Sequence, residues 1–69
     1  MFRYSVNLRW SEDDGCYIAE IPEFPGLSAF GKTPEDAARE ARTAALGFME
    51  VYKEDGIPLP EPFTLQKAA

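Results

Sequence analysis

The sequence predicts an α+β fold: a single small domain in which one helix packs on a β-sheet. Residues 2–10 alternate between apolar and polar side chains, which is typical of a half-buried strand. Over residues 34–54, apolar side chains recur every three or four positions, which is typical of an amphipathic helix. Glycines and prolines at turn-like spacings separate the two patterns. The expected order of elements is therefore β-β-β-α-β.

Turn residues divide the first half of the chain into strands. Residues 11–15 read Ser-Glu-Asp-Asp-Gly, and Gly15 can adopt the positive φ that a hairpin turn requires. Pro22 ends the second strand because it has no N–H for the ladder. Pro25 and Gly26 fit the middle of a type II turn, after which the third strand begins. The first three strands are expected at about residues 2–10, 16–21 and 27–30.

The start and end of the helix have strong local signals. Gly31 permits a sharp exit from the third strand, Thr33 is a suitable N-cap, and Pro34 suits the first helical position. Two acidic residues follow, and they favour the positive end of the helix dipole. Gly56 is a suitable C-terminal cap. The helix is expected at about residues 34–54.

A fourth, short strand is expected at about residues 63–66, after a proline-rich connection. Three antiparallel strands leave the third parallel to the first. A right-handed helical crossover would then place the fourth strand beside the first and parallel to it. The predicted strand order is 3-2-1-4.

Composition narrows the possible functions. The chain has 69 residues and a net charge of −5, which argues against phosphate contacts with nucleic acid and is compatible with a basic protein partner or simply with solubility. It has no histidine, which excludes Ser-His and Cys-His catalysis. Its single cysteine, Cys16, can form neither an internal disulfide nor a paired zinc site.

Size and hydropathy add expectations about assembly and location. A core this small supplies little stability, so a homo-oligomer or a partner protein is expected. The first residues alternate in polarity and do not form a basic and apolar leader or a membrane span, so a cytoplasmic protein is expected.

The order and spacing of the turn and cap signals resemble the HicB antitoxin family over residues 4–62. The shared pattern has an acidic Asp-Gly turn, a strand that ends in proline, a Pro-Gly pair, a Gly-x-Thr-x-Glu-Asp-Ala helix start and a Gly-x-x-Leu-Pro-x-Pro exit. The signature positions are Gly15, Pro22, Pro25, Gly26, Gly31, Thr33 and Gly56. The resemblance implies a partial ribonuclease-H-like sheet with one helix on it. Full-length members carry a C-terminal DNA-binding domain. This chain ends at Ala69, so it is identified as a short form and operator binding is not expected.

The resemblance also implies a function without catalysis, metal or cofactor. Such an antitoxin binds a small basic, HicA-like toxin that cleaves messenger RNA and covers its RNA-binding surface. On this basis the chain is expected to bind protein and neither nucleic acid nor membrane. The candidate partner-binding residues are Glu12, Asp13, Asp14, Glu20 and Glu23, with Phe24 as an apolar anchor.

Two other functional classes are weighed against this one. The first is a stand-alone oligomeric domain with a regulatory or small-molecule-binding role and no toxin. The second is a metal-dependent nuclease, which needs carboxylates that converge from neighbouring strands. The first strand has no carboxylate, and Glu20 is the only one in the second. Residues 26–33 also match the spelling of a phosphate-binding loop, but they read as a strand, and the acidic helix start would repel phosphate.

Overall fold

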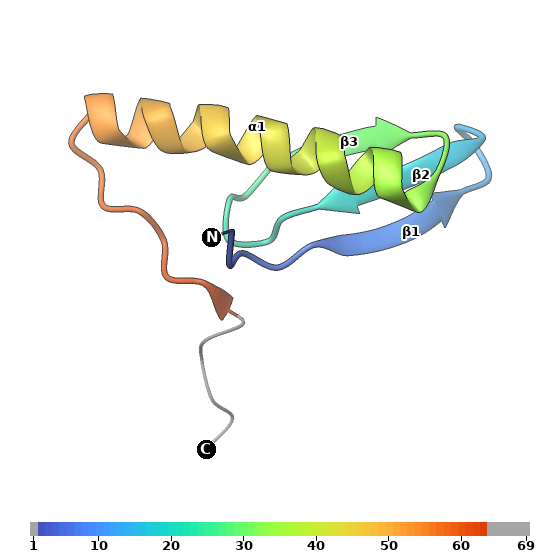
Figure 1. Ribbon diagram of the computed structural model, residues 1–69, viewed down its shortest axis with the longest axis horizontal. Helices are drawn as coiled ribbons and strands as arrows, with labels where there is room; N and C mark the ends of the chain where they lie inside the picture. Colours follow the sequence, from blue (N-terminus) through green and yellow to red (C-terminus); the bar gives the residue numbers. More distant parts are fainter. Residues whose placement is uncertain (1, 64–69) are drawn as a thin grey trace, which may run out of the picture.

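The computed structural model describes residues 2–63, which contain three strands and one helix (Figure 1). In chain order these are β1 (Asn7–Ser11), β2 (Cys16–Glu20), β3 (Ser28–Gly31) and α1 (Pro34–Glu54). The prediction of an α+β domain with a β-β-β-α order is confirmed. Phe63, the first residue of the predicted fourth strand, lies in no strand, and residues 64–66 lie outside the described part of the chain.

The strands form an antiparallel sheet in the order β1-β2-β3, which is the described part of the predicted order. β1 begins at Asn7, opposite Glu20, and not near residue 2. The reason lies in the partner strand. β2 ends at Glu20, and Pro22 has no N–H to continue the ladder, so the residues before Asn7 have no strand to pair with. Instead, Phe2, Tyr4 and Val6 pack against the core.

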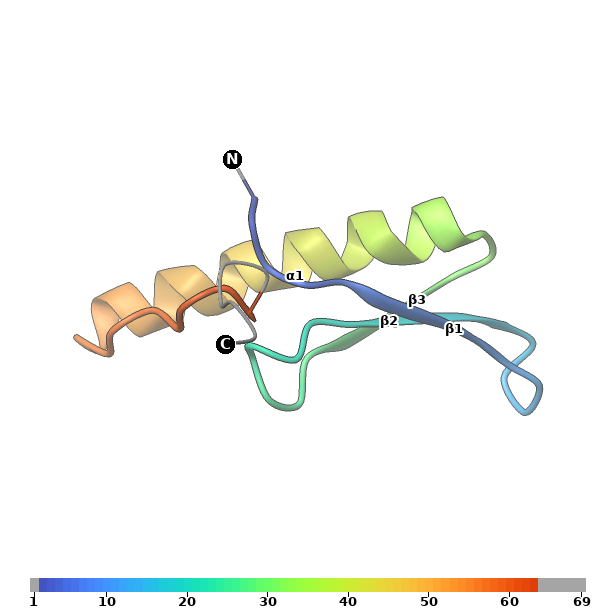
Figure 2. The same cartoon turned by 90° about the horizontal axis from the view of Figure 1, so that it is seen from below.

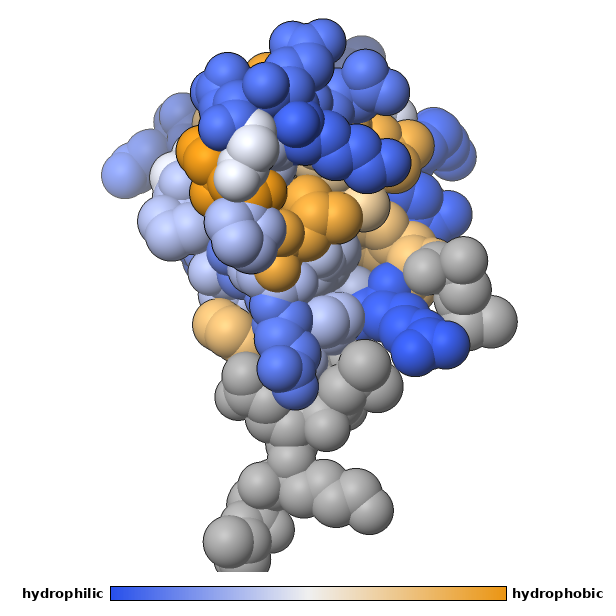
Figure 3. Space-filling model, turned by 90° about the vertical axis from the view of Figure 1, so that its left-hand side faces the viewer, coloured by the Kyte–Doolittle hydropathy of each residue, from blue (hydrophilic) through white to orange (hydrophobic). Residues whose placement is uncertain are grey.

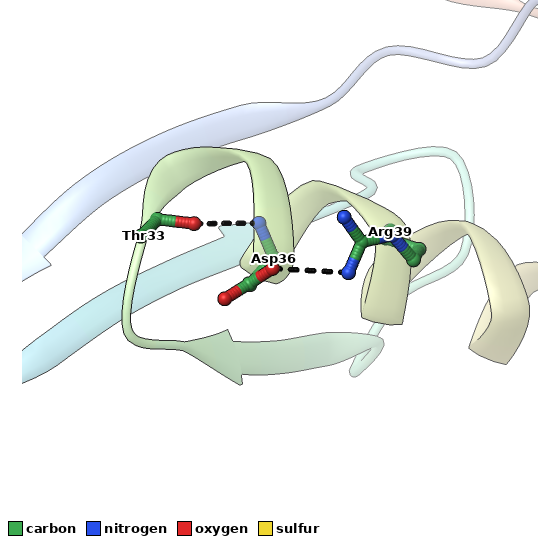
Figure 4. Close-up of polar contacts among 3 residues, drawn as sticks. All are labelled: Thr33, Asp36 and Arg39. Atoms are coloured by element: carbon green, nitrogen blue, oxygen red, sulfur yellow. Dashed lines mark hydrogen bonds and ion pairs between the residues drawn. The ribbon is translucent and has the colours of Figure 1, made fainter.

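The helix occupies Pro34–Glu54, the range given by the sequence analysis, because its start depends on local contacts. The Thr33 Oγ1 accepts a hydrogen bond of 3.0 Å from the Asp36 backbone N–H, and the Asp36 carboxylate accepts one of 3.0 Å from Arg39 (Figure 4). Pro34 has no N–H to satisfy at this position. The observed first turn of α1 therefore matches the helix start predicted from the sequence.

Small residues bring the helix close to the sheet. Ala37, Ala41 and Ala45 form the buried stripe of α1 and face Ala19. A β-carbon on Gly31 would collide with the backbone of Asp36 and Ala37, so only glycine fits where β3 leads into the helix.

Larger side chains fill the space beyond the end of the sheet. The C-terminal half of α1 extends past the strands (Figure 2), and residues 57–63 turn back from its end toward Tyr4 and Glu23. Phe24, which is fully buried, forms edge-to-face contacts with Tyr4, Phe48 and Tyr52 at ring-centroid distances of 4.9–5.8 Å. The core thus has an alanine-rich end and an aromatic end.

The helix lies mainly over β2 and β3 and touches β1 less. Leu8 and Trp10 lie on the helix side of β1, opposite Ala19 and Tyr17, and remain 45% and 48% exposed. The Trp10 ring packs edge-on against Tyr17 at 5.0 Å. No helix of the described residues is long and apolar enough to cross a membrane.

Candidate protein-binding face

One face of the sheet has no layer over it. Residues that pair across strands share a face, so Ala19 and Ala29, which pack under α1, place their strand neighbours on the other side. Within residues 2–63 no helix or strand covers that side (Figure 2). We call it the open face, and its residues are Asn7, Arg9, Ser11, Cys16, Ile18, Glu20, Ser28 and Phe30.

Two loops bound the open face. The sheet is seen edge-on in Figure 2, where the β1–β2 turn and the loop of residues 22–27 both project away from α1. The turn stands at one end of the strands and the loop at the other. In the centre, Ile18 is buried while its neighbour Phe30 is 55% exposed. The open face therefore has an apolar centre and is bounded by a loop at each end.

The β1–β2 turn, which bounds one end of the open face, is acidic. Asp14 accepts a hydrogen bond of 3.0 Å from the Ser11 hydroxyl, and Glu12 accepts one of 2.6 Å from the Trp10 indole N–H. Gly15 has a φ of 63°, as the turn requires, and its N–H donates to the Ser11 carbonyl. These contacts hold two of the carboxylates apart, and Asp13 is exposed between them.

The acidic turn does not form a metal centre. Among the residues described here, no group of three or more His, Cys, Asp or Glu side chains is placed to hold a metal ion. Consecutive turn residues point in different directions, whereas a cation needs ligands that converge.

Glu20 lies at the other end of the open face, separate from the three acidic residues of the turn. Its Oε1 lies 3.9 Å from the Arg9 Nε, and the two side chains are about half exposed. It also borders a depression of about 340 Å³ between the sheet and the loop of residues 22–27. The structure thus places Asp14 and Glu20 at opposite ends of the open face, whereas Glu12 is bonded to Trp10 on the helix side.

The loop of residues 22–27 is held by its own turns and by the core. The Phe24 N–H donates to the Ile21 carbonyl and the Leu27 N–H donates to the Phe24 carbonyl, both at 3.0 Å. Gly26 has a φ of 87°, which suits the type II turn predicted there. The buried Phe24 ring anchors the loop from beneath.

Two of the predicted contact residues are corrected by this arrangement. Glu23 is 4% exposed and Phe24 is fully buried, so their side chains do not form part of the surface of the folded domain. Phe24 fills the aromatic end of the core. Glu23 is a structural residue.

The Glu23 carboxylate joins three segments of the chain. Its Oε2 accepts hydrogen bonds from the Ser5 N–H at 2.9 Å, the Ser5 hydroxyl at 3.0 Å and the Phe63 N–H at 2.8 Å. The Oε1 is buried and has no hydrogen-bond partner. Burial acts to raise the pKa of Glu23, but the N–H groups of Ser5, Phe63 and Glu23 itself, with the Ser5 hydroxyl, outweigh it and hold the pKa below its ordinary value.

Tyr4 adds a second tie between the ends of the described chain. Its hydroxyl donates a hydrogen bond of 2.8 Å to the Pro60 carbonyl. Burial and the nearby negative charge of Glu23 raise the pKa of this phenol, so it stays a donor at neutral pH. Sequence reasoning missed these roles of Tyr4 and Ser5. Their partners lie far along the chain, and no local pattern identifies such pairs.

A second exposed surface is apolar. Viewed from the end of the molecule where α1 finishes, apolar side chains gather below the helix (Figure 3). Val51, Ile57 and Leu59 belong to this part of the chain and are 38–53% exposed.

One comparison with known proteins gives a match that covers almost the whole chain. A family model described as the HicB_like antitoxin of bacterial toxin-antitoxin systems matches residues 3–69. Searches of curated proteins and of solved structures each find no significant match.

Proposed function

Because the chain belongs to the HicB-like antitoxin family of bacterial toxin–antitoxin systems, we propose that it neutralises a small basic toxin that cleaves messenger RNA. In this proposal the antitoxin covers the surface with which the toxin binds RNA. The partner is HicA-like, and the antitoxin contributes binding and no catalysis.

The observation that carries the proposal is the open face with its acidic ends. A protein that binds RNA presents basic side chains to phosphates. A face that offers carboxylates at both ends, with an apolar centre, complements such a surface and competes with RNA for it. Asp14, which is bonded to Ser11, and Glu20 are exposed carboxylates at the two ends of this face. Asp13 is exposed in the same turn, and Glu12 is bonded to Trp10 on the helix side.

The net charge of the chain also favours a basic protein as the partner. The net charge of −5 attracts a basic protein over distances longer than a direct contact and raises the rate of productive encounter. It also disfavours direct contact with the RNA itself.

The proposal extends to organisation and assembly. Residues 1–69 form one HicB-like domain with a partial ribonuclease-H-like sheet, and the domain acts in the cytoplasm. It self-associates, because its core is small and the exposed side chains of Val51, Ile57 and Leu59 offer an apolar surface for a second copy.

The test is neutralisation of a toxin encoded beside this chain. The basic protein from the neighbouring reading frame is expressed with the antitoxin, and RNA cleavage by the purified mixture is measured. Wild-type antitoxin should suppress cleavage at equimolar ratio. The double variant Asp13→Lys with Glu20→Lys should lose most of this effect, because it reverses the charge at both ends of the open face.

A matched control reverses two acidic residues elsewhere. Glu50 and Glu54 are exposed on α1, away from the open face. Glu50→Lys with Glu54→Lys makes the same change in net charge and should still suppress cleavage. Equal loss in the two double variants would count against the open face, and cleavage that persists in excess wild-type protein would count against the antitoxin role.

A further inference from the structure

The depression beside Glu20 is a built groove and not a gap between flexible parts. Its floor is the sheet row Asn7, Glu20 and Ser28, and its wall includes Pro22, Pro25 and Gly26. The wall is fixed by two turn hydrogen bonds and by the buried side chains beneath it. A binding site on such a rigid wall loses little entropy when it is occupied.

The wall is rich in hydrogen-bond acceptors. Pro22 and Pro25 have no N–H, and the N–H groups of Phe24 and Leu27 are already bonded within the loop. The Ile21 and Phe24 carbonyls accept these two bonds, and the other residues of the loop carry further carbonyl oxygens. A surface with many acceptors and few donors suits a side chain that only donates, and arginine and lysine are the two charged examples.

Glu20 gives the groove its negative charge. Among the described residues that line the groove, Glu20 is the only ionisable one. Its contact with Arg9 is long, at 3.9 Å, and half exposed, so it contributes little and leaves the carboxylate available to another cation.

The size of the groove limits the occupant. Its volume of about 340 Å³ lies at the low end of the range for small-molecule sites, about 300–1,000 Å³. This is room for one long side chain. A loop with several carbonyl acceptors beside a carboxylate suits the planar five-donor fork of a guanidinium better than the compact ammonium of lysine.

We infer that this groove receives an arginine side chain of the basic protein partner, with Glu20 as its counter-ion. The inference rests on the proposed function only for the identity of the partner. In the free protein Arg9 forms only a weak ion pair with Glu20, and the arginine of the partner replaces Arg9 in that pair.

The direct test uses a blocked arginine, N-acetyl-arginine N-methylamide, as the probe. It is titrated into the full-length ¹⁵N-labelled protein, and backbone amide shifts are followed by NMR. Saturable shifts should concentrate at Glu20, Gly26, Leu27 and Ser28. The corresponding citrulline compound has the same shape without the charge and should cause much smaller shifts. Blocked lysine should bind more weakly than blocked arginine.

Three variants test which charged side chain binds the probe. Glu20→Gln should weaken arginine binding about fivefold, as expected for a partly exposed ion pair. Glu50→Gln, on the exposed face of α1, should leave it unchanged. Arg9→Gln should strengthen it about twofold because it removes the competitor. Equal shifts with citrulline, or equal weakening by Glu50→Gln, would overturn the inference.

The two proposals fail separately. If the toxin is neutralised equally by wild type and Glu20→Gln, and blocked arginine gives no localised shifts, the groove inference is wrong and the antitoxin role stands. If blocked arginine binds at the groove but no toxin is neutralised, the groove inference holds and the antitoxin role is wrong.

Discussion

At the residue scale, Glu23 is a charged side chain in the interior of a 69-residue protein. An isolated buried carboxylate is costly, and hydrogen bonds to the charged form offset that cost. Here three donors from two distant segments converge on one oxygen, while the other oxygen has no partner. The ionised form of Glu23 therefore supports the fold in spite of its burial.

The first prediction concerns the pH dependence of stability. The pKa of Glu23 is lower in the folded protein than its ordinary value of 4.5, so the unfolded chain takes up this proton more readily. The stability that Glu23 contributes should be fully present above about pH 4.5 and should be lost as the pH falls through the lower folded pKa. Thermal unfolding between neutral and acidic pH measures this. Glu23→Gln should be less stable at neutral pH and should lose less stability on acidification, and parallel pH profiles would contradict the assignment.

The second prediction compares two glycines. Gly31→Ala should destabilise the fold by about 1–3 kcal/mol, because its β-carbon would meet the backbone of Asp36 and Ala37, which cannot move aside cheaply. Gly47→Ala lies in the middle of α1, where the new β-carbon would meet nothing within 4 Å beyond the adjoining helix backbone, and should stabilise the fold by about 1 kcal/mol. Urea unfolding of both variants tests the pair. Changes of the same sign would show that the steric contrast is wrong.

The predicted binding residues illustrate what a sequence conveys about single side chains. The exposure of Glu12, Asp13 and Asp14 follows from turn chemistry, which is local. Glu23 and Phe24 stand in a similar proline-rich loop, yet one is bonded to Ser5 and Phe63 and the other to the aromatic core. Their burial depends on partners distant in sequence, so the local pattern could not reveal it.

At the element scale, the helix was predictable from end to end and the first strand was not. A cap, a proline at the first position and an apolar stripe are all local to residues 33–54. The extent of β1 depends on a partner strand, and that partner ends at Glu20 because of Pro22. Alternating polarity continues to Phe2, but there those apolar residues pack against the core without strand pairing.

The third prediction tests the helix cap. Thr33→Ala removes the acceptor for the Asp36 N–H and should cost about 1 kcal/mol. Thr33→Ser keeps the hydroxyl and should cost much less. Chemical denaturation of both variants measures the difference. The Asp36–Arg39 ion pair is exposed, so Arg39→Ala should change stability little, by about 0–0.5 kcal/mol.

At the scale of the whole molecule, one helix and three strands among the described residues leave one face of the sheet uncovered. This agrees with the half-buried strand that the alternation of residues 2–10 predicted. The direction of the loop of residues 22–27 could not be predicted from the sequence, because it depends on where Phe24 and Glu23 anchor the chain. The groove beside Glu20 exists only through that anchoring.

The fourth prediction concerns association with the basic partner. The acidic charge of the chain should accelerate encounter at low ionic strength, and salt should remove this effect, because charges are screened beyond about 8 Å at 0.15 M. The association rate should therefore fall steeply with added salt, while the dissociation rate should change less. Stopped-flow or biolayer measurements over a salt series test this. A salt-independent association rate would contradict electrostatic steering.

The position of Trp10 has a practical consequence. It is the only tryptophan of the chain, it lies on the helix side of the sheet, and its indole N–H is bonded to Glu12 in the acidic turn. A partner on the open face would leave the indole ring uncovered, because the ring lies on the opposite side of the sheet. A partner that adds along β1 would bury the ring and shift its emission to shorter wavelength. Intrinsic fluorescence, with no attached label, therefore distinguishes the two modes of docking.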